Sequence, residues 1–159
     1  MIVYVILPYD RWRAFKAAGT NPEAEEDDGG ERPLVRPWLR RQIADRTGMD
    51  AADVHPVYAW MSRPPSSWMW PPKRAVLKVR VADELVVPID DDAYIGVLNT
   101  MGNGWVDEDA GPESMFDVRH TPEDRLRALI APRLTLEMVR KAAVYRWSVR
   151  LRRRRQRAS

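Results

Sequence analysis

The sequence has no cysteine and only two histidines among its 159 residues. The absence of cysteine excludes disulfide bonds, thiolate metal sites and a cysteine nucleophile, and it favours a reducing compartment, the cytoplasm. The two histidines, His55 and His120, are far apart in the chain, which argues against a histidine-rich metal site. We interpret each of them as a structural or surface residue rather than a catalytic one.

Long apolar runs and common catalytic motifs are also missing. No apolar stretch approaches about 18 residues, so we expect no transmembrane helix and no membrane partner. The first residues lack a basic leader, and Pro8 interrupts their apolar run, so they do not predict a signal peptide. The sequence contains no GxxxxGK[ST], GxGxxG, HExxH or GxSxG motif, which removes the usual nucleotide, zinc-protease and serine-hydrolase patterns.

Charge is distributed unevenly along the chain. From Met138 to the end there are nine Lys or Arg residues and no acid, whereas the first 137 residues have a net charge of −6. This asymmetry suggests contact with nucleic acid, through the following residues of the basic end: Arg150, Arg152, Arg153, Arg154 and Arg155. A solubilising, disordered tail explains the same residues equally well. We expect one domain over residues 1–151 and a flexible basic tail over 152–159.

Local patterns predict a mixture of strands and helices. Strands are expected at residues 2–7, 54–61, 75–81, 85–89, 133–137 and 143–151. Helices are expected after Asp10 up to Gly19, over 34–46 before Gly48, over 93–98, and from Thr121 to the residue before Pro132. The irregular order of strands and helices indicates an α+β fold with a mixed or antiparallel sheet and flanking helices.

Two further features have alternative interpretations. The run Asp90-Asp91-Asp92 offers oxygen ligands for a divalent ion, but a helix cap with solvated acids requires no ion and is preferred. Four of the seven tryptophans are expected at a strand end or on loops, where they could stack on a base or on a nicotinamide ring, or pack under the proline-rich segment 62–72: Trp60, Trp68, Trp70 and Trp105.

The order of several short motifs resembles a family of small bacterial and phage proteins of unassigned function. The matching segments are, in order, Val3-Tyr4-Val5-Ile6, Pro37-Trp38-Leu39-Arg40-Arg41-Gln42-Ile43, His55-Pro56-Val57-Tyr58-Ala59-Trp60, the strand at 75–81, Val86-Val87-Pro88-Ile89-Asp90-Asp91-Asp92, Val97-Leu98-Asn99 and Met115-Phe116-Asp117. The resemblance covers most of the chain. Its most specific elements are the Pro-x-Tyr-x-Trp and Leu-Asn motifs.

That family in turn is similar to the ADP-ribosyltransferase fold, especially to DNA-modifying toxins. In those toxins a late strand reads Gln-Ala-Glu, and Arg133 stands here at the glutamine position, with Thr135 at the position of the catalytic glutamate. The nearest acid is Glu137. If residues 133–137 form a strand, Arg133, Thr135 and Glu137 share one face, and Glu137 can approach the same cleft.

The resemblance implies NAD as the substrate, and the residues themselves lead us to expect no metal. Loss of nicotinamide develops positive charge on the ribose, which a carboxylate such as Glu137 would stabilise. Tyr4, Tyr58 and Trp60 are expected to line the NAD pocket, and Arg63 or Arg133 is expected to meet the diphosphate. Packing in the core is the alternative role for the three aromatic residues.

Two functions therefore remain open from the sequence. The first is transfer of ADP-ribose from NAD to a macromolecule, with nucleic acid or protein as the acceptor. The second is a catalytically inactive binding module that binds nucleic acid or inhibits a host protein, for example through the acidic segment 23–31.

Overall fold

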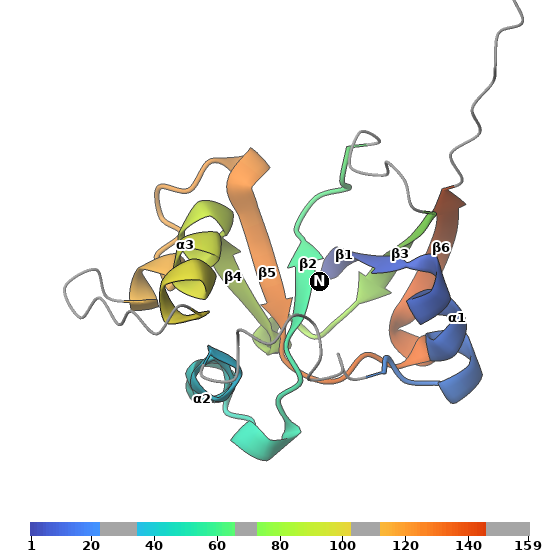
Figure 1. Ribbon diagram of the computed structural model, residues 1–159, viewed down its shortest axis with the longest axis horizontal. Coiled ribbons are helices and arrows are strands. Elements are labelled where there is room, and N and C mark those ends of the chain that lie inside the picture. Colours follow the sequence, from blue (N-terminus) through green and yellow to red (C-terminus); the bar gives the residue numbers. More distant parts are fainter. Residues whose placement is uncertain (23–34, 66–72, 103–111, 146–159) are drawn as a thin grey trace, which may run out of the picture.

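A computed structural model describes residues 1–22, 35–65, 73–102 and 112–145 (Figure 1). They form one α+β domain with a six-stranded antiparallel sheet in the order β4-β5-β2-β1-β3-β6. The strands are β1 (Ile2–Pro8), β2 (Val57–Trp60), β3 (Arg74–Arg80), β4 (Val86–Asp90), β5 (Leu126–Ile130) and β6 (Val139–Tyr145). The helices are α1 (Tyr9–Ala18), α2 (Val35–Thr47) and α3 (Asp91–Gly102). The α+β prediction is confirmed.

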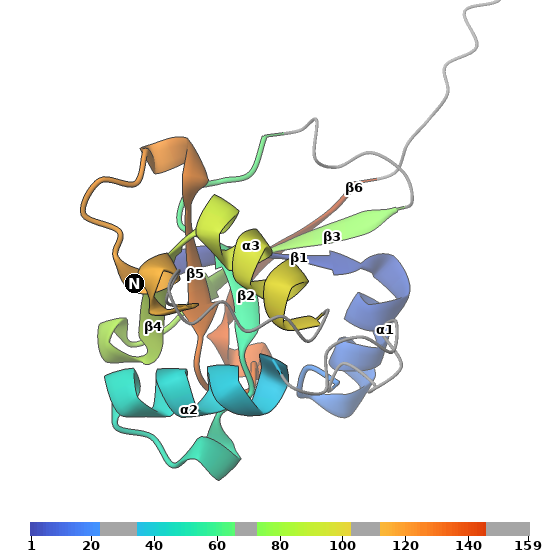
Figure 2. The same ribbon diagram turned by 60° about the vertical axis from the view of Figure 1, so that its left-hand side comes forward.

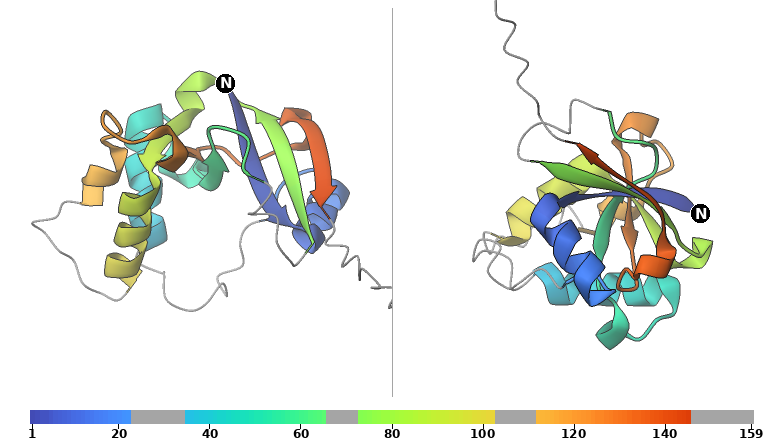
Figure 3. Two further views of the ribbon diagram at one scale, coloured as in Figure 1. Left: turned by 90° about the horizontal axis from the view of Figure 1, so that it is seen from above. Right: turned by 90° about the vertical axis from the view of Figure 1, so that its right-hand side faces the viewer.

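The sheet divides into two halves at the junction of β1 and β2, where the strands pair over fewer positions than within either half. Strand β1 pairs with β3 over seven positions, whereas the register between the described parts of β1 and β2 comprises the single pair Tyr4 and Trp60. One half is therefore β1-β3-β6 and the other is β2-β5-β4. Seen from above, β1, β3 and β6 lie with α1 on one side of the molecule, and α2 and α3 lie on the other (Figure 3).

A core lies on each face of the sheet, and the core beneath α1 spans both halves, since it also contains Ala59, Ala128 and Ile130 of β2 and β5. Alternation in β1 and β3 buries Val3, Val5 and Leu77 beneath α1, which contributes Trp12 and Phe15. The other face of β4 and β5 is covered by α2 and α3 (Figure 2). This second cluster contains Leu39, Ile43, Val87, Ile89, Val97 and Leu129.

Several sequence predictions are confirmed by the local structure. Gly19 and Gly48 follow α1 and α2 with φ of 79° and 74°, a backbone conformation that glycine adopts without a steric penalty. The predicted alternation of β3 is present, since Leu77 and Val79 are buried while Lys78 and Arg80 are exposed. Pro88 is tolerated in β4 because that strand lies at the edge of the sheet.

Other predictions are wrong. Asp10 does not cap α1, which begins at Tyr9 after Pro8, so Asp10 lies in its first turn. The helix predicted after Thr121 is a short 3-10 turn, Glu123–Arg125, followed by β5. Tertiary context overrides the local helix pattern here, because β5 fills the position between β4 and β2 and pairs with both.

The strand predicted over residues 133–137 is also wrong. Residues Leu136–Met138 form a 3-10 turn, and Thr135 makes an isolated bridge with Thr20. Strand β6 begins at Val139, earlier than the predicted start at residue 143. The expectation that Arg133, Thr135 and Glu137 alternate on one strand face therefore loses its basis.

Candidate functional site

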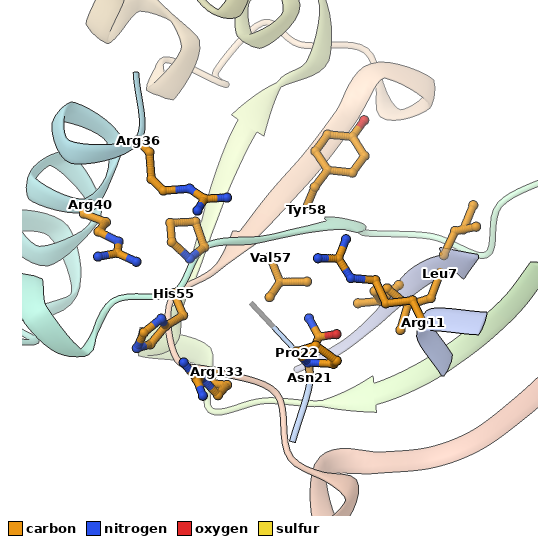
Figure 4. A pocket seen from close by; sticks show the side chains of 13 residues that line it. Leu7, Arg11, Asn21, Pro22, Arg36, Arg40, His55, Val57, Tyr58 and Arg133 are labelled. Atoms are coloured by element: carbon orange, nitrogen blue, oxygen red, sulfur yellow. The ribbon is translucent and has the colours of Figure 1, made fainter. Parts of the chain in front are cut away.

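A cavity of about 250 Å³ opens where β1 and β2 diverge beyond their single pair (Figure 4). Its walls come from the end of β1, the start of β2, α1, α2 and the segment after β5. The full set of lining residues is Val5, Ile6, Leu7, Arg11, Asn21, Pro22, Arg36, Arg40, His55, Pro56, Val57, Tyr58 and Arg133. We call this cavity the β1–β2 cleft.

Four arginines line the β1–β2 cleft, and no described lining residue carries a carboxylate. Arg11 comes from α1, Arg36 and Arg40 come from α2, and Arg133 follows β5. Arg36 and Arg40 are four positions apart, which places both on the same side of their helix. Figure 4 shows the guanidinium groups of α2 and of Arg11 entering the cleft from opposite walls.

The Nε of Arg40, a donor, and the Oδ1 of Asn21, an acceptor, are buried and lack a hydrogen-bond partner within the described chain. Both residues line the cleft. Leaving a buried donor without a partner costs about 1–3 kcal/mol, more when the group is charged. An anion seated beside α2 would accept from the Arg40 guanidinium and recover part of this cost.

Tyr58 lines the cleft but directs its hydroxyl away from the arginines (Figure 4). The hydroxyl donates to Oδ1 of Asp91 at 2.5 Å, and the Tyr58 ring stacks on Tyr94 at 5.7 Å. Burial first, and then the bond to Asp91, raise the pKa of Tyr58 far above its ordinary value. The phenol therefore stays protonated at neutral pH and presents its ring to the cleft.

The other residues expected around NAD lie outside the lining of the cleft. Trp60 is 6% exposed, and the guanidinium of Arg127 lies 3.7 Å from the centre of its ring, so it packs in the sheet. Tyr4, the register partner of Trp60, is half-buried on the same sheet face. Arg63 is exposed and donates to the hydroxyl of Tyr145 at 2.9 Å.

The candidate acid and its neighbour are also outside the lining. Glu137 is exposed on the 3-10 turn before β6, and Thr135 is half-buried at the start of that turn. Of the residues that the resemblance assigned to NAD, the structure brings Tyr58 and Arg133 into one cavity. The arginines of the basic tail, together with Trp68, Trp70, Trp105 and the acidic segment 23–31, lie outside the described residues.

The three aspartates at the start of α3 all contact protein groups. Asp90 caps the helix by accepting from the backbone N–H of Ala93 at 3.0 Å, which confirms the interpretation of Asp90 as a cap. Asp91 accepts from Tyr58, and Asp92 pairs with Arg125 at 2.6 Å. Within the described ranges no group of three or more His, Cys, Asp or Glu residues is arranged to hold a metal ion.

Sequence reasoning did not single out Arg11, Arg36 or Arg40, which dominate the walls of the cleft. The pair at positions 36 and 40 was visible as an i, i+4 repeat of cations in a predicted helix. The pair forms part of a cavity only together with a second wall. That wall comes from α1 and from the segment after β5, which approach α2 only in the folded chain.

Comparisons with family models, curated proteins and solved structures found no match to this chain. The described helices include none that is both long enough and apolar enough to span a bilayer.

Proposed function

We propose that this protein binds the diphosphate of a dinucleotide of the NAD type in the β1–β2 cleft. The observation that carries the proposal is the convergence of four arginines on a cavity whose described lining has no carboxylate. Guanidinium groups bind phosphate oxygens in pairs of parallel hydrogen bonds, so they suit a diphosphate better than a neutral ligand.

The size of the cleft limits which part of the ligand it holds. Its volume of about 250 Å³ lies just below the range of about 300–1,000 Å³ that is common for small-molecule pockets. The cleft therefore fits a diphosphate with an adjoining sugar, and the remaining parts of a dinucleotide would extend from it. The ring of Tyr58 provides an apolar surface beside the arginines.

The binding experiment is calorimetric titration of the full chain with NAD and, separately, with inorganic pyrophosphate. The double variant Arg11→Gln/Arg40→Gln removes one cation from each wall. Hydrogen bonds to charged groups contribute about 1.5–3 kcal/mol each, so affinity for both ligands falls roughly a hundredfold or more.

A matched control comes from the same two helices. Arg13 and Arg41 are exposed, lie outside the lining of the cleft, and change the net charge equally when replaced by glutamine. The Arg13→Gln/Arg41→Gln variant is expected to bind NAD as the wild type does. Equal losses in both double variants would mean that net charge, not the cleft, governs binding, and would contradict the proposal.

Transfer of ADP-ribose from bound NAD to a macromolecule is the second candidate. The presence of both Tyr58 and Arg133 in the cleft favours it. The test incubates the protein with NAD labelled on the adenylate, together with duplex DNA, single-stranded DNA, RNA and a bacterial lysate. Label on a macromolecule supports transfer, whereas NAD binding without turnover supports a module that binds and does not react.

The resemblance assigns Glu137 as the acid of the transfer reaction, and its position on an exposed turn outside the cleft lining makes this assignment the first to test. Glu137→Ala is expected to abolish labelling while leaving NAD affinity within about twofold, because the side chain lies outside the cleft lining. Glu84→Ala changes another exposed acid and serves as the control. Undiminished labelling by the Glu137→Ala variant would exclude Glu137 as that acid.

A further inference from the structure

A second cationic region lies on the β1-β3-β6 half of the sheet, apart from the β1–β2 cleft. These three strands contain five Lys or Arg residues and no Asp or Glu: Arg74, Lys78, Arg80, Arg140 and Lys141. Lys78, Arg80, Arg140 and Lys141 are exposed. We call these four side chains, with the adjoining Tyr4, the β3–β6 basic face.

The centre of the β3–β6 basic face is a pair of like charges. Lys78 of β3 and Lys141 of β6 are direct partners in the antiparallel register, so both side chains point to the same face of the sheet. Like charges at directly opposed positions destabilise a sheet. Neither lysine forms a salt bridge within the described chain, so no internal acid offsets this repulsion.

The neighbouring residues extend this charge in two directions. Arg80 lies two positions from Lys78 on the same strand and therefore shares its face. The register shift between Lys78 and Val79 leaves Arg140 as an extra, unpaired residue of β6, and a bulge of this kind redirects a side chain at a sheet edge.

Protection of the sheet edge accounts for part of this arrangement. Cations and bulges on an edge strand discourage pairing with another chain, which explains Arg140 and Lys141 on β6. Protection of the edge does not explain the charges of Lys78 and Arg80, because β3 is an inner strand that pairs with both β1 and β6. Lys78 and Arg80 are exposed and form no salt bridge within the described chain, so their charges are accessible to a partner that carries negative charge.

An aromatic side chain adjoins the lysine pair in the same row of the sheet. Tyr4 of β1 is the register partner of Lys78 and is half-buried. Reading across the sheet, the row is therefore Tyr4, Lys78 and Lys141. An aromatic ring beside a line of cations is the combination that binds single-stranded nucleic acid, with a base on the ring and phosphates on the cations.

We propose that the β3–β6 basic face is a docking surface for single-stranded nucleic acid. Lys78 and Lys141 would hold consecutive phosphates, with Arg80 and Arg140 flanking them, and Tyr4 would contact a base. The proposal does not depend on NAD binding, because none of these residues lines the β1–β2 cleft.

The test measures fluorescence anisotropy of a labelled oligothymidylate titrated with the full chain over a range of salt concentrations. For the variant Lys78→Gln/Lys141→Gln, the expected result is an affinity that falls roughly tenfold. Because each contact to a single strand contributes about −0.7 to the slope of log K against log salt, that slope is expected to become less steep by about 1.4. All variants keep residues 146–159, so any contribution from those residues cancels in the comparison.

Two further variants sharpen the test. Arg13→Gln/Arg41→Gln carries the same charge change elsewhere and is expected to keep the wild-type affinity and slope. Tyr4→Ile retains a strand-forming side chain but removes the ring, so affinity is expected to fall about tenfold with an unchanged slope. Circular dichroism confirms that each variant is folded.

Three outcomes would overturn the proposal. The first is an unchanged affinity and slope in the Lys78→Gln/Lys141→Gln variant. The second is an equal loss in the Arg13→Gln/Arg41→Gln control, which would indicate attraction by net charge alone. The third is binding of a duplex of the same length as tightly as the single strand, since a sheet face with one ring offers duplex DNA no stacking contact.

Discussion

The two halves of the sheet differ in pairing, covering and charge. In the β1-β3-β6 half, long ladders join the strands, one helix covers one face, and the strands contain cations without acids. In the β2-β5-β4 half, two helices cover the opposite face, and the strands contain one cation, Arg127, and one acid, Asp90. A single register pair joins the halves at Tyr4 and Trp60.

This contrast teaches where a site can form in a small sheet. Where β1 and β3 pair fully, buried side chains of the two strands pack against one another. Where β1 and β2 diverge after one pair, the two strands separate and the β1–β2 cleft lies between them. Side chains from both halves line this cleft. The candidate site therefore exists because β1 and β2 pair at a single position, and its geometry depends on the cores on both faces of the sheet.

The largest expected effects come from weakening each core separately. Leu77→Ala removes a fully buried side chain from the first half, and Leu129→Ala removes one from the second. Each is expected to lower the free energy of unfolding by about 2–5 kcal/mol, from lost burial and a residual cavity. Urea unfolding followed by both tryptophan fluorescence and circular dichroism measures this loss.

The same experiment tests whether the halves unfold together. Coincident transitions by the two probes in both variants are expected if the sheet is one cooperative unit. Separate transitions in either variant would show that the single pair does not couple the halves. Ile95→Ala, at a side chain that is 48% exposed, is the control and should change stability by less than about 0.5 kcal/mol.

A smaller effect is expected from the hydrogen bond that ties the cleft to α3. Tyr58→Phe removes the bond to Asp91 and should cost about 2 kcal/mol, because the acceptor is charged and half-buried. Folding raises the pKa of Tyr58. The protonated hydroxyl therefore contributes its full stabilisation below the pKa of tyrosine in the unfolded chain, about 10, and this stabilisation declines as the pH rises above that value.

Guanidinium unfolding at several pH values between neutral and alkaline checks this prediction. The wild type should lose stability above about pH 10 more steeply than the Tyr58→Phe variant. Tyr4→Phe, which has no hydroxyl contact to Asp91, should retain the wild-type slope. Parallel curves for the wild type and the Tyr58→Phe variant would mean that the Asp91 bond does not form in solution.

The smallest expected effect concerns the cap of α3. Asp90→Ala removes acceptors for the N–H of Ala93 at 3.0 Å and for the hydroxyl of Thr121 at 2.8 Å. The expected loss is about 1–2 kcal/mol, and Asp90→Asn should recover most of it because asparagine also caps helices.

The cap should also lose its effect in acid. The hydrogen bond from the Ala93 N–H lowers the pKa of Asp90. The stabilisation by the Asp90 carboxylate is therefore present above the pKa of aspartate in the unfolded chain, about 3.9, and disappears as the pH falls below that value. Thermal unfolding from pH 7 to pH 2 should show the wild type and the Asp90→Ala variant converging at the acid end. A constant difference across that range would contradict the assignment.

Features set by neighbouring residues could be predicted from the sequence. Gly19 and Gly48 mark the helix ends, the alternation of β3 identifies its buried face, and Asp90 caps α3. Each depends on contacts within a few positions along the chain. The α+β class follows from the number and type of such elements.

Features set by distant residues could not be predicted in this way. The segment after Thr121 carries good helix-starting residues, yet pairing with β2 and β4 makes Leu126–Ile130 a strand. The cleft is a stronger case, because Arg11, Arg40 and Arg133 lie far apart in sequence and meet only after folding. Tyr58 and Arg133 were expected near each other, but from a resemblance and not from local patterns.

Pro88 in β4 has a consequence for assembly. An edge strand can template the addition of a strand from another molecule, and a proline in that strand removes a backbone donor that such growth requires. The opposite edge, β6, carries adjacent cations and a bulge, so two copies meeting there would repel each other. Addition of a further strand to the six-stranded sheet is therefore disfavoured at both edges, by the proline ring in β4 and by the positive charges of β6.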